Sequence, residues 1–307
     1  MKVANLVHPR KERNVALNGA ARFRPAWMPY VFVGLPVLAI LTFYIYPFLR
    51  TLVTSFTDTR PMERMGAFVG TSNYAYIFHD PAFWDAVLNS LIYAVCVVPL
   101  MVLLPLLLAL LVRQYVPGIG AFRALYYVPA VCSLVVISLA WTSLLAYDGS
   151  INNLLMSLGV VDAPIRFLSS RWSVLFCAMI ITLWQGLPYY MIMYLAALTN
   201  IDTSLYEAAE IDGAGAVRRF FTVTVRGVQR MMYLVGVLSL IGCLKVFTEV
   251  HLLGGSISPA KTITMYLREQ TDVTYGHMGI GTAASVFLFV LTVGFMIASQ
   301  RLDGEGK

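Results

Sequence analysis

The chain has 307 residues, of which 59% are hydrophobic and 12% are charged, and its formal net charge is +6. A chain of this length cannot hide so much apolar surface inside one or two soluble cores, so the composition excludes a water-soluble protein and requires a lipid bilayer as solvent. The basic residues are dispersed and lack an aromatic platform, which argues against a nucleic-acid partner.

Six apolar runs predict an all-α integral membrane protein, because each is long enough to cross the bilayer as a helix. They cover residues 27–48, 87–112, 124–146, 173–198, 231–252 and 279–300. We expect residues 27–300 to form one six-helix transmembrane domain. It would be flanked by an N-terminal segment, 1–26, and a short tail, 301–307. The second run is longer than a span requires, which predicts tilt or an end in the interface.

The basic residues are distributed unevenly between the two sides of these spans. The N-terminal segment, the second and fourth connections and the tail hold fourteen of the 22 Lys and Arg residues, against seven in the other connections. Cytoplasmic connections carry the excess of Lys and Arg. Both termini and the connection between the fourth and fifth spans are therefore predicted to be cytoplasmic.

Catalytic and metal sites are not indicated by the sequence. No H-E-x-x-H or paired-carboxylate spacing occurs, and the histidines are scattered between tail, loops and a helix end: His8, His79, His251 and His277. Four cysteines fall in four different apolar runs, which suits buried small hydrophobes better than disulfides or metal ligands: Cys96, Cys132, Cys177 and Cys243.

The connection between the fourth and fifth spans, about residues 200–228, contains the most informative segment. Glu207-Ala208-Ala209 precedes Asp212 and Gly213, and several arginines follow. Helix-forming sequence on both sides of a turn predicts two short helices at an angle. From the residue types alone the segment is either an ordinary solvated loop or a contact surface for a soluble cytoplasmic partner.

The spacing of Glu207-Ala208-Ala209 and Gly213 resembles the EAA motif of permease subunits of binding-protein-dependent ABC importers. The family pattern ends in a Pro where this chain has Arg226, so the helix is expected to continue where relatives turn. Further matches follow the order and spacing of carbohydrate-type importer permeases: Phe68-Val69-Gly70 with Asn73-Tyr74, Phe83-Trp84 with Asn89-Ser90, Phe122-Arg123 through Pro129, and Gly254-Gly255.

This resemblance implies a type I importer permease with both termini inside, in a prokaryotic plasma or inner membrane. The implied partners are a second homologous permease, two ATP-binding-cassette ATPase subunits and an extracytoplasmic solute-binding protein. Coupling to the ATPase is implied for Glu207, Ala208, Ala209, Asp212 and Gly213. The sequence has no G-x-x-x-x-G-K-[ST] phosphate loop. We therefore expect no enzyme activity and no cofactor in this chain, with ATP and Mg²⁺ used by the partner ATPase.

Two groups of residues mark a candidate substrate pathway. Trp184, Gln185 and Tyr189 in the fourth span offer aromatic faces and hydrogen-bonding groups that suit a sugar, although aromatic residues at this spacing also serve as packing residues or interfacial anchors. Lys245 and Glu249 in the fifth span are four residues apart, which predicts one shared helical face. Ionisable groups at membrane depth commonly line a pathway, but these two also suit a mutually neutralising pair near the interface.

The functional hypothesis is an ATP-driven importer permease that forms half of a heterodimeric pore for a sugar or sugar-like solute. An importer of glycerol phosphate or another polar or anionic solute is the alternative of the same class. An ion-coupled secondary transporter is disfavoured, because the chain has few intramembrane carboxylates and no inverted repeat.

Overall fold

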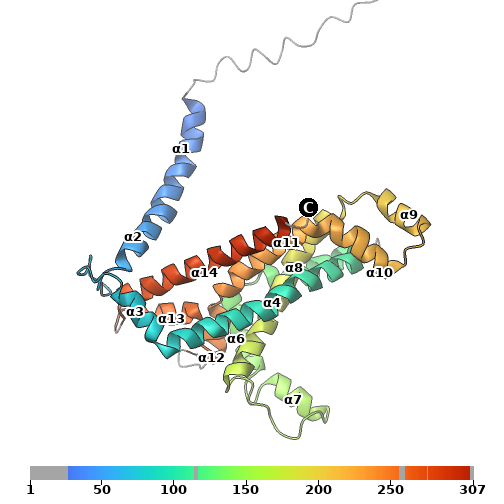
Figure 1. Ribbon diagram of the computed structural model, residues 1–307. Helices are drawn as coiled ribbons and strands as arrows, with labels where there is room; N and C mark the ends of the chain where they lie inside the picture. Colours follow the sequence, from blue (N-terminus) through green and yellow to red (C-terminus); the bar gives the residue numbers. More distant parts are fainter. Residues whose placement is uncertain (1–26, 114–116, 256–259, 275, 305–307) are drawn as a thin grey trace, which may run out of the picture. The chain divides into compact units, whose positions relative to one another are not determined.

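The computed structural model is built from helices and describes residues 27–113, 117–255, 260–274 and 276–304 (Figure 1). The predicted N-terminal segment, 1–26, and the end of the predicted tail, 305–307, lie outside the described residues. The chain divides into two compact units, residues 1–51 and 52–307.

The first unit carries the first predicted span. Helix α1 (Met28–Ile40) continues through the π-helical turn η1 (Leu41–Ile45) into α2 (Tyr46–Thr54), whose last residues belong to the second unit. Residues Tyr30–Thr54 are long and apolar enough to cross a membrane. Pro36 lies inside α1 without ending it, which agrees with the tolerance of proline in membrane helices.

The centre of the second unit is formed by α4 (Pro81–Arg113), α8 (Arg171–Leu198) and α11 (Arg226–Leu244), which pack against one another (Figure 1). The 33 residues of α4 give a helix of roughly 50 Å. This exceeds the hydrocarbon thickness of about 30 Å, as the long second run predicts. The last span, α14 (Met278–Gly304), packs against α11.

The third predicted span is not one straight helix. It consists of α5 (Ile119–Val131) and α6 (Leu134–Leu144), which meet at an angle of 92°. The backbone of Cys132 and Ser133 is extended between them, and Pro129 lacks the amide that would support the last turn of α5. The described residues therefore contain five helices of spanning length, or six spans if the bent pair counts as one.

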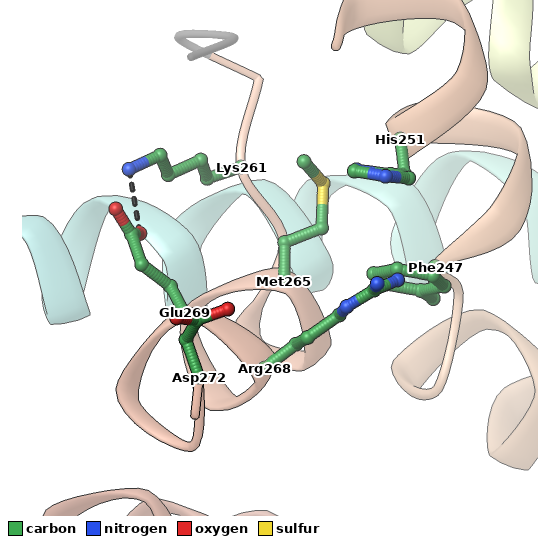
Figure 2. A pocket seen from close by; sticks show the side chains of 7 residues that line it. All are labelled: Phe247, His251, Lys261, Met265, Arg268, Glu269 and Asp272. Atoms are coloured by element: carbon green, nitrogen blue, oxygen red, sulfur yellow. Dashed lines mark hydrogen bonds and ion pairs between the residues drawn. The ribbon is translucent and has the colours of Figure 1, made fainter. Parts of the chain in front are cut away.

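Four short helices lie at the end of the bundle that the positive-inside rule places away from the cytoplasm, which we call the outer end. They are α3 (Ser72–His79), α7 (Ser150–Ser157), α12 (Thr248–Gly254) and α13 (Ile263–Gln270). A cavity of about 350 Å³ is lined by residues of α12 and α13 and of the chain flanking them (Figure 2).

Helix α13 is tied to the start of α4 by a hydrogen bond. The hydroxyl of Tyr266 donates to Oδ2 of Asp80 over 2.7 Å. Burial raises the pKa of the Tyr266 phenol, and the bond to the Asp80 carboxylate raises it further. The tyrosine therefore remains a neutral donor at physiological pH. Its hydrogen bond fixes α13 to the start of the spanning helix α4.

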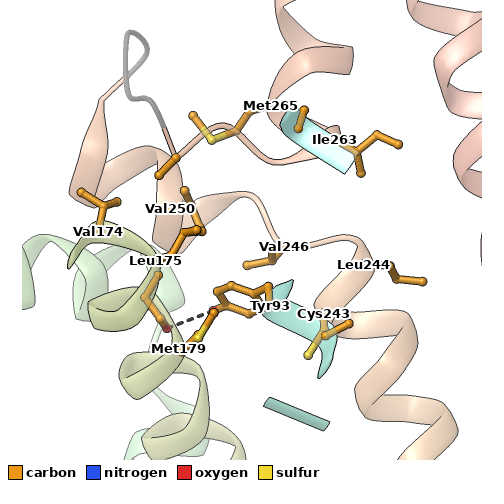
Figure 3. Packing of buried hydrophobic residues seen from close by; sticks show 14 of the residues in the cluster. Tyr93, Val174, Leu175, Met179, Cys243, Leu244, Val246, Val250, Ile263 and Met265 are labelled. Atoms are coloured by element: carbon orange, nitrogen blue, oxygen red, sulfur yellow. Dashed lines mark hydrogen bonds between the residues drawn. The ribbon is translucent and has the colours of Figure 1, made fainter. Parts of the chain in front are cut away.

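Buried side chains form two clusters, one toward the outer end and one toward the 200–228 connection. Figure 3 shows Tyr93 of α4 among side chains of α8, α11 and α12, including Met179, Cys243 and Val250. Its hydroxyl donates to the carbonyl of Ala178 over 3.0 Å. In a bilayer the association of helices rests on such packing and interhelical hydrogen bonds, since lipid supplies no hydrophobic driving force between spans.

All four cysteines are free thiols. Cys177 and Cys243 are buried, which confirms the expectation of small hydrophobic core residues. Cys96 and Cys132 are exposed on the isolated chain, so the expectation of burial is wrong for these two within the chain. Apolar surface of a spanning helix needs no protein cover, because lipid solvates it.

Candidate functional site

The predicted turn of the 200–228 connection is present and depends on Gly213. Helix α9 (Thr203–Ile211) ends at Asp212, and Gly213 follows with φ +72°. The Gly213 amide donates to the carbonyl of Glu210 over 3.0 Å, and the Ala214 amide donates to the carbonyl of Ala209 over 2.9 Å. Positive φ at the end of a helix is the conformation that glycine adopts without steric cost. The turn that reverses the chain is therefore specified locally.

Beyond the turn the chain forms one long helical run. Helix α10 (Ala216–Arg219) continues through the π-helical turn η2 (Phe220–Val225) into α11. Arg226, which stands at the place of the family proline, is the first residue of α11. The expectation that the helix continues here is confirmed. A continuous helix therefore links the Gly213 turn to the fifth span, so that a displacement of the turn would also move that span.

Helix α9 is attached to the membrane helices on two sides. The hydroxyl of Tyr206 lies 3.0 Å from Oγ1 of Thr224 in η2, and the guanidinium of Arg113, the last residue of α4, lies 5.6 Å from the Tyr206 ring centroid. Across the turn, Arg219 forms an ion pair of 3.0 Å with Glu210. The pair is largely exposed, so its own contribution is small. Together these contacts hold α9 against the ends of α4 and α11.

The surface of the turn is polar but includes exposed apolar side chains. Glu207, Ala208 and Asp212 are exposed. Ile211 is 87% exposed and Val217 is 73% exposed. Large apolar side chains that project from a polar loop favour a protein contact. Sequence reasoning singled out the EAA residues and missed Ile211 and Val217, although their apolar character within a polar stretch was a usable signal.

The start of α9 depends on a helix cap. Oδ1 of Asp202 accepts a hydrogen bond of 2.9 Å from the amide of Ser204. This bond lowers the pKa of the Asp202 carboxyl. A carboxyl with a lowered pKa stabilises the fold above the pKa of the unfolded chain, and this stabilisation is lost as the pH falls through the lowered pKa.

An Asp202→Ala substitution is expected to fray the first turn of α9, because the Ser204 amide loses its acceptor. Amide hydrogen exchange, followed by mass spectrometry, should be faster in α9 and unchanged in α8. The matched control is Asp202→Ser, which retains a capping oxygen and should keep exchange close to that of the unmodified chain. Equal exchange in the Ala and Ser variants would contradict the role of the cap.

A second feature is a cavity of about 250 Å³ between the spans, which we call the inner cavity. It lies among α4, α5, α8 and α11, and its lining includes the predicted pathway residues Gln185 and Tyr189. The described lining residues are Met101, Ala130, Thr182, Gln185, Gly186, Tyr189, Tyr190, Ser239, Gly242 and Cys243. A few hydroxyl and amide groups on an otherwise apolar wall are typical of a small-molecule site.

Gln185 and Trp184 have different environments although they are adjacent in α8. Nε2 of Gln185 donates to the carbonyl of Cys132 at the bend between α5 and α6, over 3.4 Å. The Trp184 ring packs edge-on against Trp141 of α6, with 6.0 Å between the ring centroids. Trp184 is absent from the described lining of the cavity. The ring contact of Trp184 agrees with the alternative of a packing residue, whereas Gln185 and Tyr189 line the cavity.

Close approach of α8 to α4 at this level depends on Gly186. A Cβ atom built on Gly186 would lie 2.6 Å from Cε of Met101. Such a contact is much shorter than van der Waals distance, so Met101 would have to move into the cavity that both residues line. Gly186 is thus part of a continuous α8, where it allows the close packing of α4.

Lys245 and Glu249 do not share a helical face, so that prediction is wrong. Helix α11 ends at Leu244 and α12 begins at Thr248, and the residues between them leave the helical path. The carbonyl of Val246, freed by this break, accepts a hydrogen bond of 2.9 Å from Oγ1 of Thr262. Lys245 is exposed and Glu249 is 8% exposed. The ion pairs among the described residues do not include these two.

Glu249 instead belongs to a buried hydrogen-bond chain. Oγ1 of Thr182 donates to Oε1 of Glu249 over 3.1 Å and lies 2.6 Å from the hydroxyl of Tyr93. The chain joins α12, α8 and α4. Since Thr182 also lines the inner cavity, Glu249 stands directly behind the cavity wall. Neither Glu249 nor Lys245 appears in its described lining.

Comparison with known proteins decides between the classes considered from the sequence. Residues 64–304 match the family described as "Binding-protein-dependent transport system inner membrane component". The chain belongs to this family of ABC importer permeases. It is a multi-pass protein of the inner membrane. As the permease subunit it is not itself the ATPase and binds no cofactor of its own, since ATP is used by the partner ATPase.

Two curated relatives and a solved structure cover most of the permease. The lactose transport system permease protein of Rhizobium radiobacter is 35% identical over 272 residues, which are 86% of this chain and 89% of that protein. An arabinooligosaccharide permease of Bacillus subtilis is 29% identical and covers 91% of this chain and 89% of its own length. A bacterial ABC transporter for alginate import has a TM-score of 0.80 at 22% identity, with 91% and 96% coverage. That last likeness shows the fold.

Some lining residues of the permease were not identified from the sequence. Thr182 was missed, although it precedes the predicted residues Gln185 and Tyr189 by three and seven positions. This spacing places the three on one helical face, which was a usable signal. Ser239 of α11 offered no such signal, because it lies among apolar residues with no polar neighbour at helical spacing. It joins the cavity only through the packing of α11 on α4 and α8.

Proposed function

We propose that the permease forms half of a heterodimeric pore that passes a neutral sugar or oligosaccharide inward, after delivery by an extracytoplasmic binding protein. The observation that carries the proposal is the inner cavity, whose described lining offers hydroxyl, phenol and amide groups but no charged side chain. Uncharged donors and acceptors suit a polyhydroxyl solute. The lactose and arabinooligosaccharide permeases among the relatives support the same class.

The alternative within the class is a phosphorylated or otherwise anionic solute. Desolvating an anion between spans requires a cation or a cluster of donors close by. Lys245 is the one cation among the predicted pathway residues, and it is absent from the described lining of the inner cavity. The neutral solute is therefore the better supported of the two.

Coupling to partner ATPase subunits is the second part of the proposal. Two homologous permeases and two ATPases would form the complex, with α9 and the Gly213 turn seated on the ATPase. The exposed carboxylate of Glu207 can accept charge-assisted hydrogen bonds there. Ile211 and Val217 would supply apolar contact. The continuous helix from α10 into α11 would carry the motion of the ATPase dimer to the inner cavity.

The test is uptake by the purified complex in proteoliposomes that contain ATP, with neutral sugars and glycerol phosphate offered separately. Gln185→Ala is expected to lower kcat/KM for the transported sugar about tenfold, which corresponds to the loss of about one hydrogen bond. The matched control is Gln300→Ala, at an exposed position near the end of α14. Preferential uptake of glycerol phosphate, or equal uptake by both variants, would contradict the proposal.

A further inference from the structure

The cavity at the outer end, which we call the outer cavity, is distinct from the inner one, and among the described residues no side chain lines both. Its volume of about 350 Å³ falls within the range of small-ligand pockets, about 300–1,000 Å³. It combines flat and charged groups from two segments. The residues that matter for its chemistry are Phe247, His251, Lys261, Arg268, Glu269 and Asp272.

One side of this outer cavity is a layered set of flat groups. The His251 ring stacks on the Phe247 ring, with centroids 4.9 Å apart and planes 18° apart. The Arg268 guanidinium lies 5.1 Å from the Phe247 ring centroid. Figure 2 shows Arg268 reaching from α13 toward Phe247, with His251 beside them. The three groups fix one another's orientation and present a rigid wall on which the apolar face of a sugar ring can lie.

The opposite side supplies hydrogen-bonding groups without a net charge. Nζ of Lys261 forms an ion pair of 2.7 Å with Oε2 of Glu269, and both lie across the cavity from His251 in Figure 2. Arg268 and Asp272 add one further charge of each sign. The formal charges of the lining therefore cancel. Donors and acceptors stand together, which matches hydroxyl groups that donate and accept, and favours a neutral sugar over an ion.

The wall that carries Lys261 is held in place by the spans. Nδ2 of Asn89 in α4 donates to the Lys261 carbonyl over 2.7 Å, and Nε of Arg171 at the start of α8 donates to Oδ1 of Asn89 over 2.7 Å. Arg171 also pairs with Asp85 at 3.1 Å. A site whose groups are fixed before binding loses less entropy when a ligand arrives. The backbone at Lys261 is therefore held in place by the spans before a ligand binds.

We propose that the outer cavity is a carbohydrate subsite, which holds one neutral pyranose unit of an arriving solute before the solute reaches the inner cavity. The inference rests on the proposed function, in that the transported solute is a sugar. The outer layer of the stack formed by Phe247, His251 and Arg268 contacts the ring face of the sugar. The carboxylate of Glu269 and the cations of Lys261 and Arg268 bind its hydroxyl groups, and Asp272 lies at the rim.

The test measures protection of a reporter thiol at the rim of the cavity. Asp272→Cys is made in a permease whose four native cysteines are replaced by Ala, and its labelling by a small water-soluble methanethiosulfonate is timed in the reconstituted complex. The probe is a mixture of lactose, maltose and raffinose. We expect the mixture, at a concentration well above its Kd, to slow labelling about tenfold. This factor corresponds to about 1.4 kcal/mol. The open-chain polyol sorbitol should leave the rate unchanged, because it has no ring face to lie on the stacked groups.

Two controls make the result specific to the cavity. Val273→Cys is the adjacent position, 67% exposed and absent from the lining, and its labelling should not respond to sugars. Adding Phe247→Ala to the Asp272→Cys variant should abolish protection. Protection by sorbitol equal to that by the sugars, or equal slowing at both reporter positions, would overturn the inference.

Uptake of the same sugar mixture by the unmodified permease separates this inference from the proposed function. Uptake without protection of the Asp272→Cys variant would overturn the outer subsite and leave the transport of neutral sugars intact. Protection without uptake would support the subsite and remove the proposed transport.

Discussion

A Gly213→Pro substitution is expected to abolish solute uptake while the permease still inserts into the membrane. Proline holds φ near −65°, whereas Gly213 has φ +72°. Proline also lacks the amide that Gly213 donates to the Glu210 carbonyl over 3.0 Å. Both effects destroy the turn between α9 and α10. Because the turn lies outside the spans and contributes little to their packing, the loss should act on coupling to the ATPase.

The size of the defect should follow the backbone preference of the new residue. Gly213→Asn should retain more uptake than Gly213→Ala, since Asn tolerates the left-handed region better than other non-glycine residues. The matched control is Gly215→Ala, at φ −65° and with nothing within 4 Å of the added Cβ, and it should transport normally. Uptake and sugar-stimulated ATP hydrolysis are measured in proteoliposomes. Near-normal values for Gly213→Pro would end the coupling hypothesis.

Spans set by length alone were predictable from the sequence. Residues 87–112, 173–198 and 279–300 were expected to span, and helices α4, α8 and α14 contain them. Apolar segments of this length form helices in the bilayer, because backbone groups in lipid must bond within the helix. The Gly213 turn was predictable for a related reason. Its conformation depends on local residue preferences and not on distant contacts.

The helix breaks were not predictable, because distant residues satisfy the backbone groups that they free. The carbonyl of Cys132, at the bend of the third span, is bonded by Gln185, which is 53 residues away. The carbonyl of Val246 is bonded by Thr262, which is 16 residues away. Within a continuous apolar run, nothing at helical spacing reveals such partners. Assuming an unbroken helix is what made Lys245 and Glu249 seem to share a face.

Sequence spacing found only part of the lining of the inner cavity. Gln185 and Tyr189 line the inner cavity because α8 is continuous, so helical spacing located them correctly with respect to Thr182. Ser239 comes from α11 and Ala130 from α5, and their approach depends on how three helices pack. Sequence spacing describes one face of one helix. A cavity between several helices needs the packing as well.

Removal of the Glu249 side chain is expected to destabilise the bundle, whereas removal of the Lys245 charge is not. Glu249→Ala removes the buried hydrogen bond that Thr182 donates to the carboxylate and leaves the Tyr93 hydroxyl as the remaining partner of Thr182, which costs about 1 kcal/mol. Lys245→Met changes an exposed residue that has no ion pair among those of the described chain. Unfolding of the purified permease in detergent should show a lower free energy of unfolding for Glu249→Ala and a value near the unmodified one for Lys245→Met.

Double-mutant cycles distinguish the two possible partners of Glu249. Thr182→Val and Glu249→Ala should be non-additive, because each removes the same hydrogen bond of 3.1 Å. Interhelical hydrogen bonds in membranes couple by about 0.6 kcal/mol on average and up to about 1.7 kcal/mol. Lys245→Met and Glu249→Ala should instead add within about 0.5 kcal/mol. Strong coupling in the Lys245 cycle, with none in the Thr182 cycle, would restore the ion pair and refute the buried chain that joins α12 to the wall of the inner cavity.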